Sequence, residues 1–217
     1  MAKLLFFDWD GTLAKKSVSE LASSRRFKWL DITQKKDMHD YLKNDSHYVL
    51  NKKAISNYTG LNVEDKEVTG LMTDLFKYHY LGVVNELGMD VFYPGVFSVL
   101  KKLKNEGFEL VIVTALVTDI ITNALKILGV GDFFKGVVAS NRTLDRNKTD
   151  SAREAVKLFG KPLVFFGDRM DDMLAGISVD AKTVFCEYGH GELKDFVPDF
   201  SVKSFEEILK FVIPKLE

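Results

Sequence analysis

Short apolar runs alternate with amphipathic segments along most of the chain. Four of these runs have the length of buried strands, and a fifth strand is expected in a shorter apolar stretch: 3–7, 109–113, 163–166, 183–186 and Val137–Val138. Helices are predicted where apolar residues recur three and four positions apart: 96–105, 119–128, 151–159 and 204–212. Alternation of strand and helix is typical of right-handed crossovers and of a parallel sheet covered on both faces. The pattern therefore predicts an α/β fold with a doubly wound, Rossmann-like core.

A different pattern occupies residues 15–93, directly after the first predicted strand. Leu71 and Leu75 recur at helical spacing there, and Lys and Asp fill the intervening faces. We therefore expect an inserted α-helical cap domain of residues 15–93 and an α/β core domain of residues 1–14 and 94–217. Doubly wound sheets hold their sites at the carboxyl ends of the strands, where this insertion joins the core. The cap is thus well placed to act as a lid.

Composition and charge exclude several classes of partner. Hydrophobic residues make up 46% of the 217 positions and charged residues 28%, which indicates a globular protein with a substantial core. The 30 basic and 31 acidic residues give a net charge of -1, so we expect no nucleic acid and no membrane among the partners. No apolar stretch reaches membrane-spanning length, and the single cysteine, Cys186, is expected to be a small buried hydrophobe. These features predict a cytoplasmic protein.

Acidic and hydroxyl side chains stand where the predicted strands end. In chain order they are Asp8, Asp10, Thr114, Asp168, Asp171 and Asp172. Lys148 lies in the polar approach to the helix at 151–159. The carboxyl ends of parallel strands meet at one edge of the sheet, so we expect these side chains to gather there. Because grouped carboxylates repel one another unless a hard cation joins them, the pattern predicts a Mg²⁺ site, with Lys148 adding positive charge for a phosphate.

The order of these residues resembles the haloacid dehalogenase (HAD) superfamily of phosphohydrolases. Asp8-Trp9-Asp10-Gly11-Thr12 is similar to the first motif of that superfamily, and Thr114 after Val111–Val113 is similar to the second. Lys148 stands where the lysine of the third motif belongs, and Gly167–Asp172 is similar to the acidic fourth motif. The four matches occur in order and span nearly the whole chain outside the insertion. The resemblance implies a phosphoric monoester hydrolase that works through an aspartyl phosphate.

The resemblance also implies a role for each matching residue. Asp8 would be the nucleophile, and Asp10 would protonate the leaving alcohol and later deprotonate the attacking water. Mg²⁺ would be held by carboxylates and one main-chain carbonyl, contributed by Asp8, Asp10, Asp168 and Asp172. Contacts with the substrate would come from Thr12, which could also hydrogen-bond to Asp10, and from Thr114, Ala115 and Lys148. Many members of the superfamily carry Asn at the position of Ala115, where this chain offers only a main-chain donor.

The insertion resembles the helical cap of the phosphoglycolate phosphatase and β-phosphoglucomutase branch. Tyr93–Val96 is similar to the point where that cap returns to the core, and Tyr188–Gly191 is similar to the tail of phosphoglycolate phosphatases. This resemblance implies a small phosphorylated metabolite as the partner, with phosphoglycolate as the leading candidate, and we expect a monomer or homodimer. Arg25 is a candidate for bidentate binding of an acidic leaving group, although Arg25 and Arg26 are more simply explained as exposed helix residues.

Simpler interpretations and rival functions stay open. Asp8 and Asp10 can also be turn-formers after a strand, and Asp171 is best explained as an acid in the first turn of the next helix. A phosphomutase of the same superfamily uses the same residues but returns the phosphoryl group to a sugar before water enters. A phosphoryl-receiver module or an inactive binding scaffold would keep part of the set. A dehalogenase is disfavoured, because its chemistry has no leaving oxygen for Asp10 to protonate.

Overall fold

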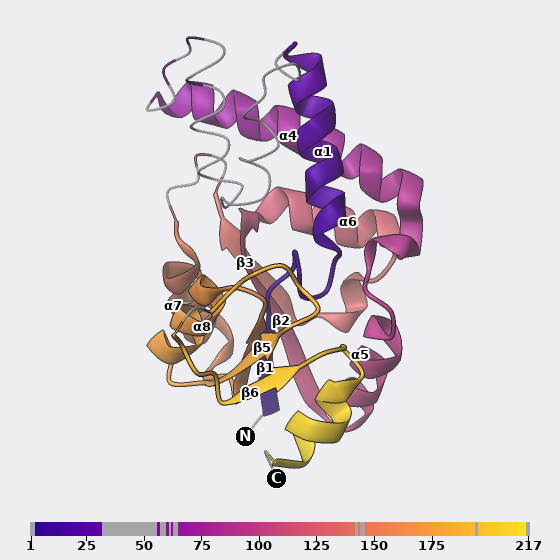
Figure 1. Ribbon diagram of the computed structural model, residues 1–217, viewed down its shortest axis with the longest axis vertical. Coiled ribbons are helices and arrows are strands. Elements are labelled where there is room, and N and C mark those ends of the chain that lie inside the picture. The colour runs from indigo at the N-terminus through magenta and orange to yellow at the C-terminus, as the bar shows by residue number, and fades with distance from the viewer. Residues whose placement is uncertain are drawn as a thin grey trace.

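The computed structural model describes residues 3–31, 56, 60, 62, 65–141, 143, 146–193 and 195–215. Its centre is a six-stranded parallel sheet with the strand order β3–β2–β1–β4–β5–β6 (Figure 1). The strands are β1 (Lys3–Phe7), β2 (Phe108–Val117), β3 (Gly136–Ser140), β4 (Val164–Gly167), β5 (Lys182–Cys186) and β6 (Phe200–Val202). The chain builds outward from β1 in one direction and from β4 in the other. This reversal confirms the predicted doubly wound α/β fold and lies where such folds hold their ligands.

Helices cover both faces of the sheet and form the insertion between β1 and β2 (Figure 1). The core helices are α5 (Val96–Asn105), α6 (Thr118–Leu128), α7 (Lys148–Phe159) and α8 (Met170–Ser178). The described part of the insertion contains α1 (Lys16–Trp29), α4 (Lys66–Leu87) and the turn η1 (Gly88–Val91). The remaining helical turns are η2 (Gly131–Phe133), η3 (Ile208–Val212) and η4 (Ile213–Lys215). Within the ranges given above, no helix is both long and apolar enough to cross a membrane.

The end of the chain departs from the predicted pattern. The three-residue strand β6 is not foreseen, because so short a run carries no clear periodicity. The regular helix expected over 204–212 is also wrong, since the wide π turn η3 forms there and η4 follows it. Phe205, Ile208 and Ile213 are all buried, and the five-residue step between the last two suits a π turn. The need to bury these side chains therefore overrides regular helical spacing.

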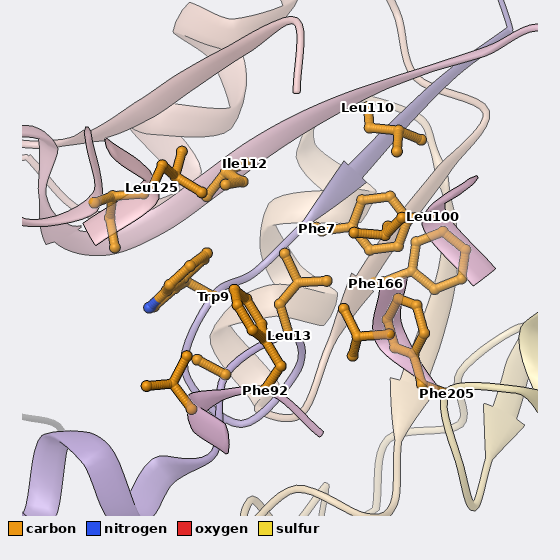
Figure 2. Packing of buried hydrophobic residues seen from close by; sticks show 14 of the residues in the cluster. Phe7, Trp9, Leu13, Phe92, Leu100, Leu110, Ile112, Leu125, Phe166 and Phe205 are labelled. Carbon is orange, nitrogen blue, oxygen red and sulfur yellow. The ribbon is translucent and has the colours of Figure 1, made fainter. Parts of the chain in front are cut away.

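Strand β1 is buried on both faces, and its alternate side chains belong to two hydrophobic clusters. Leu5 and Phe7 share one cluster with residues of α5 and α6, and Phe7 stacks on Phe166 with ring centroids 4.5 Å apart (Figure 2). Leu4 and Phe6 point to the opposite face, where α7 and α8 contribute alanines. Burial of apolar side chains on both faces stabilises β1 at the centre of the sheet. Asp8 directly follows this strand, so its backbone is held by the core.

The two segments that join the insertion to the core are hydrogen-bonded to each other. Lys15 N donates to Val91 O over 2.8 Å, and Tyr93 N donates to Leu13 O over 3.1 Å. The insertion therefore begins and ends side by side beyond the carboxyl end of β1. The domain bounds at residues 14/15 and 93/94 stay predictions.

Helices α1 and α4 pack against each other beyond the carboxyl edge of the sheet (Figure 1). Helix α4 also contacts α6 of the core, where Lys77 Nζ lies 3.2 Å from Asp119 Oδ2. Arg26 of α1 is buried, with its guanidinium 4.8 Å from the ring of Phe27 and 5.3 Å from the ring of Phe76. Burial lowers the pKa of Arg26 to about 9. The expectation that Arg26 is an exposed helix residue is therefore wrong.

Candidate active site

Asp8 and Asp168 lie side by side at the point where the strand order reverses. Asp8 follows β1 and its N–H donates to Phe166 O of β4 over 2.9 Å, while Asp168 directly follows β4. Both carboxylates are buried. After Asp8 the chain turns at Gly11, whose φ of +83° suits glycine. A Cβ at Gly11 would come within 2.3 Å of Asp168 Oδ2, so this position also has no space for a larger residue. A Cβ at Gly189 would likewise come within 2.2 Å of the Asp168 Cβ, so glycine leaves room for Asp168 at both positions.

Three buried carboxylates form a cluster that could hold a metal ion. Oxygens of Asp8, Asp168 and Asp172 all lie within 4.8 Å of one another. One oxygen of Asp168 accepts from His190 N over 2.9 Å, and one of Asp172 accepts from Arg169 N over 2.9 Å. Asp8 Oδ1 and Asp168 Oδ1, by contrast, are buried and accept no hydrogen bond. Because such oxygens are costly to bury and are the ligands that hard cations prefer, the cluster fits a divalent cation such as Mg²⁺.

The pKa values of these carboxyl groups show that their charged forms are costly to bury. Burial raises the pKa of Asp8, and burial together with the neighbouring charge of Asp8 raises the pKa of Asp168 to about 6. Burial also raises the pKa of Asp172 well above its usual range. The protein therefore holds the carboxylates in an arrangement that a bound cation would stabilise.

Lys148 supplies a positive charge inside this cluster. It is the first residue of α7, and Asn147 caps that helix by accepting from Asp150 N over 2.9 Å. Lys148 Nζ lies 2.5 Å from Asp172 Oδ1 and 3.1 Å from Asp8 Oδ2. Burial alone would lower the pKa of Lys148, but the nearby carboxylates raise it well above its usual value. The lysine is therefore held protonated beside Asp8.

Asp10 sits in a hydrogen-bonded network that involves the insertion. Ser19 Oγ of α1 donates to Asp10 Oδ2, and Tyr80 OH of α4 donates to Asp10 Oδ1 over 3.3 Å. Trp9 Nε1 in turn donates to the Tyr80 oxygen over 2.7 Å. Burial raises the pKa of Asp10 to about 7, which is near the value that suits a group acting as both acid and base at neutral pH. Ser19 and Tyr80 are additions to the site that the sequence pattern does not identify.

The other predicted substrate contacts, Thr12, Thr114 and Ala115, differ in burial and in hydrogen bonding. Thr114 is buried on β2, where its Oγ1 accepts from Leu116 N over 3.3 Å, and Ala115 beside it is exposed. Thr12 is buried, but no hydrogen bond joins its hydroxyl to Asp10, whose oxygens accept from Ser19 and Tyr80 instead. Contacts of Thr12, Thr114 and Ala115 with a substrate stay predictions.

Arg25 pairs with a carboxylate outside the cluster of Asp8, Asp168 and Asp172. Its guanidinium makes two hydrogen bonds to the carboxylate of Glu86, of 2.6 and 2.7 Å, in an exposed pair between α1 and α4. Binding of an acidic leaving group by Arg25 would require this ion pair to exchange. That role stays a prediction.

A doubly wound sheet with this set of acids at its carboxyl edge defines a class of hydrolases. Residues 2–180 match the haloacid dehalogenase-like hydrolase family, and the chain belongs to that family. The match includes Asp8 and Asp168, which directly follow β1 and β4, and Thr114, which lies inside β2 because that strand continues to Val117 instead of ending at residue 113 as predicted. The resemblance stated from the motifs is confirmed, and with it the prediction of an enzyme.

The relatives of the chain narrow this class and support a phosphatase. The phosphoglycolate phosphatase of Vibrio vulnificus (strain CMCP6) is 27% identical over 224 residues, which cover 97% of this chain and 96% of that protein. The pyrophosphatase PpaX of Halalkalibacterium halodurans is 28% identical over 127 residues, 55% of this chain and only 59% of that protein. Among solved structures, a predicted phosphoglycolate phosphatase from Haemophilus somnus superimposes with a TM-score of 0.71 at 24% identity, covering 96% of this chain and 97% of that one. The last likeness shows that the two proteins share a fold.

Proposed function

We propose that this protein is a Mg²⁺-dependent phosphatase that hydrolyses a small phosphate monoester through an aspartyl phosphate on Asp8. One observation carries the proposal. Asp8 is buried with one oxygen 3.1 Å from Lys148 Nζ and the other without a hydrogen bond, beside Asp168 and Asp172. A carboxylate in that position has a cation on one side and a vacant acceptor on the other, as a nucleophile toward a metal-bound phosphate requires.

The metal would be held by the carboxylates of Asp8 and Asp168 and the main-chain carbonyl of Asp10, with Asp172 supporting them. When bound, Mg²⁺ supplies positive charge that offsets the repulsion between Asp8 and a phosphate dianion. Lys148 adds a second positive charge beside the Asp8 carboxylate, where it can bind the phosphoryl oxygens together with Thr114.

The proposed reaction proceeds in two displacements. An Asp8 oxygen forms a bond to phosphorus while the bond from phosphorus to the ester oxygen breaks, and Asp10 gives its proton to the departing alcohol. Water then attacks the phosphorus of the aspartyl phosphate, and Asp10 takes a proton from that water. Asp8 is regenerated and inorganic phosphate is released. A pKa near 7 lets Asp10 serve in both directions.

Phosphoglycolate is the proposed substrate. Support comes from relatives that bear the name phosphoglycolate phosphatase along nearly their whole length, such as those of Vibrio vulnificus and Psychrobacter arcticus. The return of the insertion at Tyr93–Val96 and the tail at Tyr188–Gly191 resemble the same branch. Tyr188 also joins this tail to the first motif, since its hydroxyl donates to Thr12 O over 2.9 Å.

Phosphate release from a panel of esters tests this proposal. The panel contains p-nitrophenyl phosphate, phosphoglycolate and small sugar phosphates, each assayed with Mg²⁺ and with EDTA. We expect metal-dependent release that is fastest for phosphoglycolate. A preference for another ester would keep the mechanism and contradict the substrate. Transfer of phosphate between two positions of a sugar, without free phosphate, would favour the mutase alternative, and inactivity toward the whole panel would contradict a phosphatase.

A further inference from the structure

The carboxylate of Asp10 bridges the core and the insertion. Asp10 lies in the turn after β1, whereas its two hydrogen-bond donors come from α1 and α4. Ser19 and Tyr80 are both fully buried, so water does not compete for their hydroxyl groups. One carboxylate of the core is therefore held by one hydroxyl group from each of two helices of the insertion.

Trp9 fixes the direction of the Tyr80 hydroxyl group. An indole N–H can only donate, so the Tyr80 oxygen, 2.7 Å from Trp9 Nε1, is the acceptor of that bond. The hydrogen of Tyr80 is then left for Asp10 Oδ1. Trp9 is itself fully buried, with its ring 5.5 Å from that of Phe92 in an edge-on arrangement (Figure 2). Packing thus holds the indole, and the indole orients the phenol.

Ser19 supplies the second donor. Its hydroxyl group donates to Asp10 Oδ2, whereas Tyr80 donates to Oδ1. The two oxygens of the carboxyl group are therefore held from two different helices.

We propose that Tyr80, oriented by Trp9, and Ser19 are positioning residues that fix the orientation of the Asp10 carboxyl group. The proposal rests on the proposed function, in which Asp10 protonates the leaving alcohol. Because each oxygen accepts from a different helix, rotation of the carboxyl group would break both hydrogen bonds. Asp10 has both of its hydrogen-bond donors only when α1 and α4 pack against the core.

The test compares two esters that differ in their need for an acid. Nitrophenolate leaves without a proton, whereas the alkoxide of phosphoglycolate needs one, and general acids contribute about 10²–10⁴-fold to such steps. We expect Tyr80→Phe to lower kcat/KM for phosphoglycolate by about 10–100-fold and for p-nitrophenyl phosphate by less than about 3-fold. Asp10→Asn should show the same pattern with a larger loss. Ser19→Ala should show it with a smaller one, because a water molecule can replace a small hydroxyl group.

Matched controls lie on the same two helices. Tyr78→Phe removes a hydroxyl group from an exposed tyrosine of α4, and Ser17→Ala does the same for an exposed serine of α1. Both should leave kcat/KM unchanged for either ester. Equal losses on the two esters for Tyr80→Phe would mean that the phenol supports the whole site, and would overturn the proposal, as would no loss at all. If Asp10→Asn lowered kcat/KM equally for the two esters, Asp10 would not be the acid of the proposed function. The proposal that Ser19 and Tyr80 position that acid would then fail as well.

A second measurement needs no activity. The chain has two tryptophans, so Trp29→Phe isolates the fluorescence of Trp9. In that background, Tyr80→Phe removes the acceptor of the indole N–H and should shift the emission of Trp9 to shorter wavelength, while Tyr78→Phe should not. An emission spectrum that does not change would overturn the orienting contact, whatever the rates show.

Discussion

The two groups of residues at the carboxyl edge of the sheet are built in different ways. Asp8, Asp168 and Lys148 take their places from strand ends and from the first turn of α7, all within the core. Asp10 takes its hydrogen-bond donors from the insertion. The first group carries buried carboxylate oxygens that accept no hydrogen bond, whereas both oxygens of Asp10 accept one. In the proposed mechanism, the core supplies the charges that bind a phosphoryl group, and the insertion positions the acid.

The largest effect is expected at Asp8, the proposed nucleophile. Asp8→Asn should lower phosphate release by at least about 10³-fold, because the amide cannot form the aspartyl phosphate. The fold should be intact, because Lys148 keeps its ion pair with Asp172 and burial, which raises the pKa of Asp8, makes the charge of Asp8 costly to hold. Rates and circular dichroism of the purified variant check both points. Turnover above that of a mock preparation would refute the nucleophile assignment.

Substitution of Lys148 tests the contribution of positive charge in the core separately from the positioning of Asp10 by the insertion. Lys148→Ala should lower kcat/KM by about 10²–10³-fold on both activated and alkyl esters, because its contribution does not depend on the leaving group. It should also destabilise the protein by about 3–5 kcal/mol, the usual cost of breaking a buried ion pair.

The control for this change lies on the same helix. Lys157 of α7 is exposed, and Lys157→Ala should change neither rate nor stability. Isothermal titration with Mg²⁺ should still find a site in Lys148→Ala. Unchanged catalytic efficiency in that variant would remove Lys148 from the phosphate site.

Two glycines with the same backbone conformation test the cation site by itself. Gly11 and Gly107 both have a φ of +83°, but a Cβ at Gly11 would lie 2.3 Å from Asp168 Oδ2, whereas a Cβ at Gly107 would meet nothing within 4 Å. Alanine at either position should cost roughly 1–2 kcal/mol of backbone strain. Only Gly11→Ala should also weaken Mg²⁺ binding, by about 10-fold, the factor that 1.4 kcal/mol represents. Similar affinities for the two variants would contradict the role of Asp168 as a ligand.

The smallest effect concerns a carboxylate outside the site. Burial alone would raise the pKa of Asp199, but donors from Lys182 and Thr183 lower it below its usual value. Because its pKa in the folded state is lowered, the stabilisation is present above the unfolded value of about 3.9 and is lost as the pH falls through the folded value. Because Asp199 is exposed and solvent screens its charge, Asp199→Asn should cost only about 0.5 kcal/mol at pH 7.

Urea unfolding at pH 7, 5 and 3 measures the difference in the free energy of unfolding between the wild type and Asp199→Asn. The gap between the wild type and Asp199→Asn should shrink at pH 3, whereas the fold of Asp8→Asn should not be weakened at any of these values. A gap that stays constant with pH would contradict the ionic contribution of Asp199. The contrast marks Asp8 as a carboxylate whose charge the fold tolerates, and Asp199 as one whose charge stabilises it.

The sequence predicts the core better than it predicts the insertion. Apolar runs identify five of the six strands, and the acids after them lie at the expected edge because parallel strands end together. Asp8 and Asp168 are close for that reason alone. The neighbouring strands carry them there whatever the rest of the chain does.

Ser19 and Tyr80 could not be predicted in the same way. Each occupies a helix face with no distinguishing spacing, and its contact with Asp10 depends on how α1 and α4 dock on the core. Arg26 shows the same limit, because its burial between Phe27 and Phe76 exists only once those helices have packed. Periodicity reports which side of an element is apolar. It does not report which polar group on a second element will meet it.

The paired segments at Leu13–Lys15 and Val91–Tyr93 bear on how such enzymes diversify. Since the entry and exit of the insertion are already hydrogen-bonded neighbours, lengthening the chain between them leaves the ends of the loop where they were. Each doubling of a flexible loop costs only ~0.6 kcal/mol of closure entropy. The junction is therefore a place where the inserted helices can be exchanged or lengthened while the strands that precede Asp8 and Asp168 stay unchanged.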